Sequence, residues 1–291
     1  MTDKAPFIKL DHVSVIYPNG LSAIDDISFT LQPGRICGLV GVNGAGKSTL
    51  FKTMMGFLRP TRGTVEIMGG PVRDALKRSL IAYVPQTEDV DWNFPVLVED
   101  VVMMGRYGHM GLMRRPSAED RQAVEDALRR VNMLDFRKRQ IGELSGGQKK
   151  RIFVARTLAQ GGKILFLDEP FTGIDVKTEN TLTQLFRELA AEGRLILVST
   201  HNLGSVPSFC DDVILINRKL IATGPVDIAF TQENLTEAFG GMLRHIHVGG
   251  GDLHDDEDRR LVTVLTDDER PVVLYGEAGG QKIMQPAKDK T

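Results

Sequence analysis

One glycine-rich segment of eight residues, ending in lysine and serine, constrains this chain more than any other feature. It reads GVNGAGKS from Gly41 to Ser48, between the apolar run Ile36–Val40 and a stretch with helical periodicity. Glycines allow successive backbone N–H groups to turn inward and hold phosphate oxygens. In this strand–loop–helix context, Lys47 is expected to reach the β- and γ-phosphates of a nucleotide, and the Ser48 hydroxyl to bind Mg²⁺. The predicted phosphate-binding residues are Gly41, Asn43, Gly44, Ala45, Gly46, Lys47, Ser48 and Thr49.

Two carboxylates follow another apolar run. Asp168 and Glu169 come directly after Ile164–Leu167, which is typical of a buried parallel strand. Ligands of open α/β sheets bind at the carboxyl ends of the strands. Asp168 is therefore expected to hold Mg²⁺, and Glu169 to act as the general base that polarises the attacking water. The pair alone would also fit an acidic turn, but the glycine-rich loop favours the functional interpretation.

A second glycine-containing segment precedes a basic and then helical run. Ser145, followed three residues later by Gln148, fits a helix capping box. The two glycines between them leave the helix N-terminus uncovered, so its N–H groups and the positive end of its dipole can face an anion. The residues alone support two interpretations: a well-made helix start, and a second phosphate-binding element.

At this segment the chain resembles one large family. Leu144–Gln148 matches the full signature of the ATP-binding-cassette (ABC) ATPases, and the other landmarks stand in that family's order over about residues 6 to 244. The resemblance implies an α/β fold: an ABC-type P-loop NTPase core with an antiparallel β subdomain and a helical subdomain inserted at about residues 88–160. It also implies a head-to-tail homodimer, in which each ATP lies between the Gly41–Ser48 loop of one subunit and the Ser145–Gln148 helix start of the other.

Further residues match the family's pattern, and their roles follow from the resemblance alone. Tyr17 matches the aromatic residue that stacks on adenine, and Gln86 matches the glutamine that joins the metal site to the transporter interface. Asp175 matches the aspartate of a loop that crosses between subunits, and His201 matches the histidine that contacts the γ-phosphate. The crossing loop usually reads Ser-Ala-Leu-Asp, so Thr172–Ile174 departs from the pattern while the aspartate is kept.

The motifs and the resemblance together predict one composite site for ATP and Mg²⁺. The predicted catalytic residues are Lys47, Gln86, Glu169 and His201. The predicted ligands of the Mg²⁺ that accompanies ATP are Ser48, Gln86 and Asp168. The other predicted nucleotide-binding residues are Tyr17, Gln148 and Asp175, together with Ser145, Gly146 and Gly147, which the partner subunit is expected to contribute.

Apolar runs and turn signals predict the remaining elements. Strands are predicted at residues 7–17, 23–31, 36–40, 81–84, 164–167, 195–198 and 213–216. Helices are predicted at 117–131, where Ser117 caps the first turn, and at 176–191. Composition changes after His245. Together with the extent of the resemblance, this change predicts a nucleotide-binding domain at 6–244 and a C-terminal extension at 245–291.

The extension leaves several interpretations open. Glycines at 249–251 and an acidic run are typical of a linker. Apolar segments at 261–265 and 271–275 suggest a hairpin. Residues 281–291 are expected to be disordered. A regulatory metal sensor, a solvated linker and a dimerisation element all fit this composition. The sensor would use His245, His247, His254, Asp255 and Asp256.

Charge and hydropathy restrict the class of protein. Balanced charge, with 36 basic and 38 acidic residues, gives no electrostatic case for nucleic-acid binding. No run of about 18 apolar residues is present, and residues 1–6 lack the apolar core of a secretory signal. Cys37 and Cys210 form no disulfide framework, which favours a reducing compartment. The chain is expected to be soluble and cytoplasmic.

The absence of a sustained heptad run argues against an ABC protein of DNA repair, and the single cassette argues against one of translation. The remaining interpretation is a transporter ATPase that docks on separate membrane-spanning permease subunits, at the cytoplasmic face of the bacterial inner membrane. That arrangement is typical of bacterial importers, which also use a metal-binding periplasmic or surface protein when they carry metal.

The segment after Gln86 resembles the metal-ion importers, and Val98–Met113 is closest to the Sit/Yfe type for manganese and chelated iron. The resemblance places this segment near the groove that receives a helix of the membrane subunit. Its methionines, at 103, 104, 110 and 113, suit an adaptable apolar contact, and packing inside a helical subdomain explains each of them equally well. Manganese and ferrous iron are the favoured cargo. A zinc or chelate importer and a non-transport ABC ATPase are the alternatives.

Overall fold

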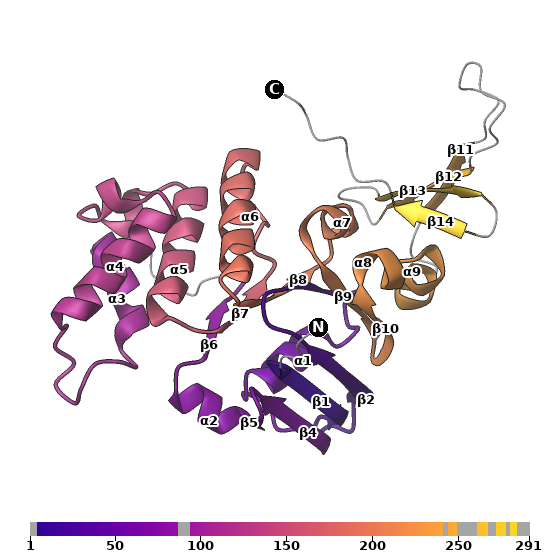
Figure 1. Ribbon diagram of the computed structural model, residues 1–291, viewed down its shortest axis with the longest axis horizontal. Helices are drawn as coiled ribbons and strands as arrows, with labels where there is room; N and C mark the ends of the chain where they lie inside the picture. Colours follow the sequence, from indigo (N-terminus) through magenta and orange to yellow (C-terminus); the bar gives the residue numbers. More distant parts are fainter. Residues whose placement is uncertain are drawn as a thin grey trace. The chain divides into compact units, whose positions relative to one another are not determined.

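The computed structural model describes residues 5–86 and 94–240, and beyond them the backbone of four strands (Figure 1). These are β11 (Arg244–Val248), β12 (Leu261–Thr266), β13 (Val272–Glu277) and β14 (Gly280–Ile283). The chain divides into two compact units. The first unit comprises residues 1–8, 31–35 and 66–198, and the second comprises residues 9–30, 36–65 and 199–291.

One sheet of the second unit contains β1 (Ile8–Ile16), β2 (Ser22–Leu31) and β4 (Arg62–Ile67), in the order β2-β1-β4. The first two confirm the strands predicted at 7–17 and 23–31, whereas β4 was not predicted. Gly63 of β4 has a φ of 78°, and a Cβ at this position would collide with the carbonyl oxygen of His12 in β1. Glycine therefore allows β4 to approach β1 closely.

A second set of strands in this unit leads into the glycine-rich loop. β3 (Ile36–Val40) is buried at every position and pairs in parallel with β9 (Asp212–Asn217), as expected for a strand covered on both faces. β10 (Lys219–Pro225) pairs antiparallel with β9. The loop after β3 runs into α1 (Lys47–Met54), which confirms the predicted strand–loop–helix order.

Short helices complete the second unit. η4 (Leu203–Ser205) and α7 (Val206–Phe209) follow one another directly, and α8 (Val226–Ala229) and α9 (Gln232–Phe239) pack on β9 and β10. α9 begins at Thr231, whose side chain accepts a hydrogen bond from the N–H of Asn234. None of these helices was predicted, since three to eight residues carry too little periodicity to reveal them.

The strands of the first unit are β5 (Gly70–Pro71), β6 (Ile81–Val84), β7 (Ile164–Asp168) and the start of β8 (Leu195–Thr200). β6 and β7 run parallel, with Ile81 opposite Ile164 and Val84 opposite Leu167, and β8 is the other neighbour of β7. Parallel pairing brings the carboxyl ends of these strands to one edge. The three longer strands confirm the predictions at 81–84, 164–167 and 195–198.

Helices make up the rest of the first unit. They are α2 (Val72–Lys77), α3 (Val98–Met103), α4 (Ala118–Arg130), α5 (Gly146–Gln160) and α6 (Val176–Ala191), with 3₁₀ turns η1 (Met104–Arg106), η2 (Leu134–Phe136) and η3 (Ile141–Glu143). α3, α4 and α5 pack against one another, as Figure 1 shows. Ser117 caps α4 as predicted, and α6 has the predicted bounds.

The C-terminal strands form a separate antiparallel sheet in the order β11-β12-β13-β14. β12 and β13 confirm the predicted hairpin. The prediction of disorder from residue 281 was wrong for 281–283, which lie in β14 and pair with β13. This polar segment has little strand propensity of its own, so only its pairing with a neighbour reveals it. The remaining tail, the residues 249–251 and the acidic run lie outside the described residues.

Among the described residues, no helix is long and apolar enough to cross a membrane. The domain boundaries at 88, 160 and 244 stay predictions. Residues 94–160 do consist of helices, 3₁₀ turns and loops, in agreement with the helical character expected there.

Candidate functional site

The glycine-rich loop of the second unit wraps around its own lysine. Gly44 and Gly46 have φ angles of 82° and 98°, which residues with a Cβ rarely adopt. The Lys47 side chain is buried, and its ammonium donates hydrogen bonds to the carbonyl oxygens of Gly41 at 2.5 Å and Val42 at 3.1 Å. A positive charge therefore lies inside the curve of the loop.

The start of α1 adds further donors to this loop. No side chain caps the helix at Gly46, and no acidic residue lies in its first turn. The first N–H groups of such a helix lack intrahelical acceptors and carry the positive end of its dipole. Asn43 and Ser48 are exposed. An ammonium, uncapped N–H groups and an exposed hydroxyl form a donor set that fits a phosphate and, at the hydroxyl oxygen, a Mg²⁺ ion.

Neighbouring strands fix the shape of the loop. A Cβ at Gly41 would collide with the carbonyl oxygen of Ile216, at the end of β9. The carbonyl oxygen of Ala45 accepts a hydrogen bond of 2.8 Å from the N–H of Arg218. A Cβ at Gly46 would meet the carbonyl oxygen of Ala23 in β2 at 2.7 Å. Backbone atoms of neighbouring strands thus contact the loop on both sides and fix its conformation.

Tyr17, the residue expected to stack on adenine, lies in the same unit as the loop. It follows β1 and is half-buried. Its hydroxyl and the Thr49 hydroxyl of α1 are 3.0 Å apart and share a hydrogen bond. Tyr17 is therefore attached to the helix that follows the glycine-rich loop, and stacking on adenine stays a prediction.

The predicted carboxylates lie where β7 ends, in the first unit. Asp168 is the last residue of the strand, and Glu169 follows with a φ of 46°. A left-handed conformation in a residue with a side chain is uncommon and costs on the order of 1–3 kcal/mol. The Nε2 atom of Gln86 donates to Glu169 Oε2 at 2.5 Å, and the Thr172 hydroxyl donates to the same oxygen at 3.3 Å.

Parallel pairing of β6 and β7 explains why these distant residues meet. Tyr83, in β6, lies opposite Phe166 in β7, and its hydroxyl donates to Asp168 Oδ2 at 3.4 Å. Gln86 lies two residues after the end of β6, and Glu169 lies directly after the end of β7. The structure thus brings together Gln86, Asp168 and Glu169, three of the predicted site residues, at the carboxyl ends of two strands.

A further residue at this cluster escaped the sequence analysis. Lys150, in α5, donates hydrogen bonds from its ammonium to the carbonyl oxygens of Pro85 at 3.2 Å and Gln86 at 3.4 Å. It ties the Gln86 segment to the helix that starts at Ser145. The basic run 149–151 was visible, but its partners lie about 65 residues earlier in the chain, and no local pattern indicates them.

The capping box predicted for Ser145 and Gln148 is confirmed in both directions. The Ser145 hydroxyl accepts from the Gln148 N–H at 3.3 Å, and the Gln148 side-chain oxygen accepts from the Ser145 N–H at 2.9 Å. The two glycines between them differ. A Cβ at Gly146 would meet nothing within 4 Å, whereas a Cβ at Gly147 would lie 2.9 Å from the Thr178 hydroxyl. Gly146 therefore faces open space, and Gly147 faces α6.

Asp175 caps α6 within its own chain. Its Oδ1 atom accepts from the Thr178 N–H at 3.0 Å, and Oδ2 accepts from the Thr178 hydroxyl at 2.8 Å. These two bonds, the backbone one first, hold the pKa of Asp175 below its usual value. Oδ2 also lies 3.2 Å from the place that a Cβ of Gly147 would take. Asp175 is thus a neighbour of the Ser145–Gln148 segment, and its role between subunits stays a prediction.

The two units divide the predicted site residues. The second unit holds Tyr17, the Gly41–Thr49 loop and His201, which follows β8. The first unit holds the other predicted residues: Gln86, Ser145, Gly146, Gly147, Gln148, Asp168, Glu169 and Asp175.

The histidines of the C-terminal extension are candidate ligands of the suggested metal sensor. His245 and His247 lie in β11, and the other members of the suggested sensor, His254, Asp255 and Asp256, lie outside the described residues. Among the residues that the structure does describe, no group of three or more His, Cys, Asp or Glu side chains could hold a metal ion. The sensor therefore stays an untested hypothesis.

Comparisons with known proteins agree with this geometry. The profile of a family described as ABC transporter matches residues 24–172. The chelated iron transport protein YfeB of Yersinia pestis is 63% identical over 93% of this chain and 92% of its own length. The manganese transport ATP-binding protein MntA of Synechocystis is 57% identical over 81% of this chain and 90% of its own length.

Solved structures share the fold. A chain of a metal-chelate type ABC transporter in an inward-facing conformation matches with a TM-score of 0.74 and 26% identity, over 90% of this chain and 98% of that one. CbiO1 of Clostridium perfringens matches with a TM-score of 0.70 and 29% identity, over 80% of this chain and 94% of its own. With its glycine-rich loop, its Leu144–Gln148 segment and its relatives considered together, the chain belongs to the ABC transporter family.

Proposed function

We propose that the chain is the ATP-hydrolysing subunit of a divalent-metal importer, with manganese and ferrous iron as the cargo. The contact between Gln86 and Glu169, beside Asp168, is the observation that supports ATP hydrolysis most directly. It gives the expected general base a fixed orientation. The cargo rests on the relatives, one of which is described as a chelated iron transport protein and another as a manganese transport protein.

In this proposal each residue of the chain has a defined task. Lys47 and the N–H groups of the loop bind the β- and γ-phosphates, and Tyr17 stacks on adenine. Mg²⁺, held by Ser48, Asp168 and Gln86, would neutralise charge on the phosphates. Glu169 accepts a proton from the attacking water, and His201 binds the γ-phosphate. Lys47, Gln86, Glu169 and His201 would thus carry the chemistry.

The complete site would require two copies of the chain. Gly146 is exposed and faces open space at the start of a 15-residue helix, and its N–H group lies between the two that the capping box uses, so it can face an anion. In a head-to-tail homodimer, this start would meet the γ-phosphate bound by the partner's glycine-rich loop, with Gln148 and Asp175 beside it. ATP would then close the dimer, and hydrolysis would allow it to reopen.

A surface for the membrane-spanning permease is proposed on the segment after α3. Met104, Tyr107, Leu112 and Met113 are exposed there. Met103 and Met110 are half-buried, so packing inside the helical subdomain explains these two as well as a contact with the permease does. Through this surface the chain would work as a peripheral subunit on the cytoplasmic face of the inner membrane. A metal-binding periplasmic or surface protein would deliver the ion to the permease, and nucleic acid has no part in the cycle.

The cargo can be tested with the assembled transporter in lipid vesicles. ATP hydrolysis would be measured with the binding protein loaded with manganese, ferrous iron or zinc, and with the metal-free binding protein. Manganese and iron are expected to raise the rate by about tenfold, within the usual range of coupling between sites. A response to zinc alone would favour a zinc importer, which is how the 41% identical TroB of Treponema pallidum is described. Equal rates with and without metal would contradict import of metal.

A further inference from the structure

The exposed segment between α3 and α4 is attached to the C-terminal end of α5. α5 ends at Gln160, and the Gly161 N–H returns to the carbonyl oxygen of Leu158. The last carbonyl groups of a helix have no intrahelical donor and need one from elsewhere. Arg106 donates from a terminal guanidinium nitrogen to the Ala159 carbonyl at 3.0 Å, and a ring nitrogen of His109 lies 2.8 Å from the Gln160 carbonyl oxygen.

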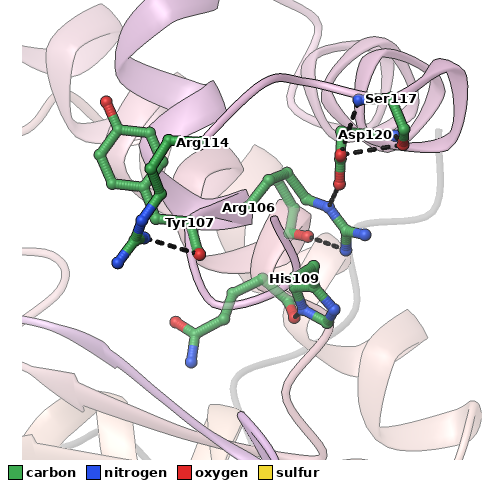
Figure 2. Close-up of polar contacts among 8 residues, drawn as sticks. Arg106, Tyr107, His109, Arg114, Ser117 and Asp120 are labelled. Carbon is green, nitrogen blue, oxygen red and sulfur yellow. Dashed lines mark hydrogen bonds and ion pairs between the residues drawn. The ribbon is translucent and has the colours of Figure 1, made fainter. Parts of the chain in front are cut away.

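The same arginine binds the start of α4, as Figure 2 shows. Its Nε atom donates to Asp120 Oδ1 at 2.8 Å, while Asp120 Oδ2 accepts from the N–H and the hydroxyl of Ser117. The side chains of Arg106 and Asp120 are 14% and 5% exposed. Solvent therefore weakens this ion pair far less than it weakens the surface pairs of α4. Charge also suits both helix ends, since Arg106 is a cation at a C-terminus and Asp120 an anion at an N-terminus.

Backbone contact makes the attachment rigid. A Cβ at Gly105, the residue before Arg106, would collide with the carbonyl oxygen of Arg156 in α5. No side chain therefore separates the 3₁₀ turn η1 from the helix at this point. Displacement of η1 must displace α5, because close-packed backbone cannot be compressed.

The opposite end of α5 carries the Ser145–Gln148 segment. The helix has 15 residues, and at 1.5 Å per residue it spans about 22 Å. Lys150, near that end, also binds the segment that carries Gln86. A movement at the Arg106 end would thus reach both the Ser145–Gln148 segment and the Gln86 carbonyl.

We propose that Arg106 is a positioning residue. With His109 and Asp120 it attaches the exposed apolar segment at 104–113 to α5, so that a partner bound to this segment moves the Ser145–Gln148 end of the helix. The inference rests on the proposed function, in which the partner is the permease. Arg106 touches neither nucleotide nor cargo in this account. Its effect on hydrolysis comes through α5 alone.

A purely stabilising role would give a different result. If Arg106 only supported the fold, its loss would reduce hydrolysis by the isolated chain and by the assembled transporter in equal proportion. If it transmits movement, the isolated chain keeps its activity and the transporter loses its response to the loaded binding protein. The ratio of stimulated to basal hydrolysis therefore separates the two roles.

The test uses the double variant Arg106→Gln, Asp120→Asn, which leaves no unpaired buried charge. His109→Ala is a second variant that leaves the ion pair intact. Arg129→Gln is the matched control, because Arg129 forms exposed ion pairs with Glu125 and Asp126 of its own helix. Basal hydrolysis is measured on each isolated chain, and stimulated hydrolysis on each assembled transporter, with the manganese-loaded binding protein as the probe.

We expect basal hydrolysis within about twofold of wild type for all three variants. Stimulation should fall from about tenfold to below about twofold in the double variant, fall partly in His109→Ala, and stay unchanged in Arg129→Gln. Full stimulation in the double variant, or an equal loss of basal and stimulated activity, would overturn the inference. A wild-type transporter that gives no response to any loaded metal would instead contradict the proposed function, and the inference with it.

Discussion

The Nε2 atom of Gln86 donates a hydrogen bond to the Oε2 atom of Glu169 across 2.5 Å. The two residues are 83 positions apart, and each follows a strand of the same parallel pair. The contact thus links Gln86, which is expected to join the metal site to the transporter interface, with Glu169, which is expected to polarise the attacking water. A change in the Gln86 segment would therefore change the orientation of the general base.

The role of Glu169 can be tested by an isosteric change. Glu169→Gln removes the proton acceptor and keeps the size of the side chain, so ATP binding should be retained. Turnover should fall by roughly 10²–10⁴, the usual contribution of a general base. Binding is measured by equilibrium titration with ATP and turnover by phosphate release. Wild-type turnover in the variant would remove Glu169 from its assigned role.

The two glycines of the Ser145–Gln148 segment offer a matched pair of variants. In the isolated chain, the methyl group added by Gly146→Ala would meet no atom within 4 Å. The change also improves helix propensity, so the free energy of unfolding should not fall. ATP hydrolysis should nevertheless drop by about tenfold or more, because the partner's phosphate requires close approach of the backbone at this position. Phosphate release and chemical denaturation measure the two effects.

Gly147→Ala should behave differently from Gly146→Ala. Its Cβ would lie 2.9 Å from the Thr178 hydroxyl and 3.2 Å from Asp175 Oδ2, so the start of α6 must shift. We expect the free energy of unfolding of the isolated chain to fall by about 1–3 kcal/mol. Full hydrolysis in Gly146→Ala would contradict the composite site between subunits, whatever Gly147→Ala does.

The close approach of η1 to α5 makes Gly105 sensitive to substitution. Gly105→Ala would force its Cβ against the Arg156 carbonyl and should destabilise the chain by about 1–3 kcal/mol. Gly111→Ala is the control, because a Cβ at that position meets nothing within 4 Å. The control should stay within about 0.5 kcal/mol of wild type in urea denaturation. Equal stability of both variants would mean that η1 does not rest on α5.

Asp120 should make stability depend on pH in the acid range. Hydrogen bonds from the Ser117 N–H, the Arg106 side chain and the Ser117 hydroxyl lower the pKa of Asp120 to about 2, from a usual 3.8. A carboxyl whose folded pKa is lowered stabilises the fold above its unfolded pKa, and this contribution is lost as pH falls through the folded pKa. The stability difference between wild type and Asp120→Asn should therefore be constant above about pH 5 and shrink as pH falls below about 4. Urea denaturation of both proteins from pH 7 to pH 3 measures it, and a difference that stays constant to pH 3 would contradict the lowered pKa.

Local chemistry explains what the sequence could predict. The Gly41–Ser48 loop, the Ser145–Gln148 capping box and the Asp168–Glu169 pair each depend on neighbours in sequence, because a phosphate loop or a helix start is built from consecutive backbone groups. Long helices such as α6 were predictable for the same reason, since 16 residues contain several periods of the apolar pattern.

Contacts between distant segments could not be predicted. The Lys150 ammonium meets carbonyl oxygens about 65 residues away, and Arg106 meets a carbonyl 53 residues away. Neither contact leaves a local pattern, because a backbone carbonyl is present at every residue. The strand β14 was missed for a related reason, as its stability comes from pairing with β13 rather than from its own sequence.

Manganese uptake by cells distinguishes a metal importer from an ATPase with another task. Bacteria that lack this chain would be complemented with wild type or with Glu169→Gln, and uptake of labelled manganese would be measured with and without excess ferrous iron or zinc. We expect that only wild type restores uptake and that iron competes with manganese. No restoration by wild type, although the purified chain hydrolyses ATP, would contradict manganese import and leave only the ATPase assignment.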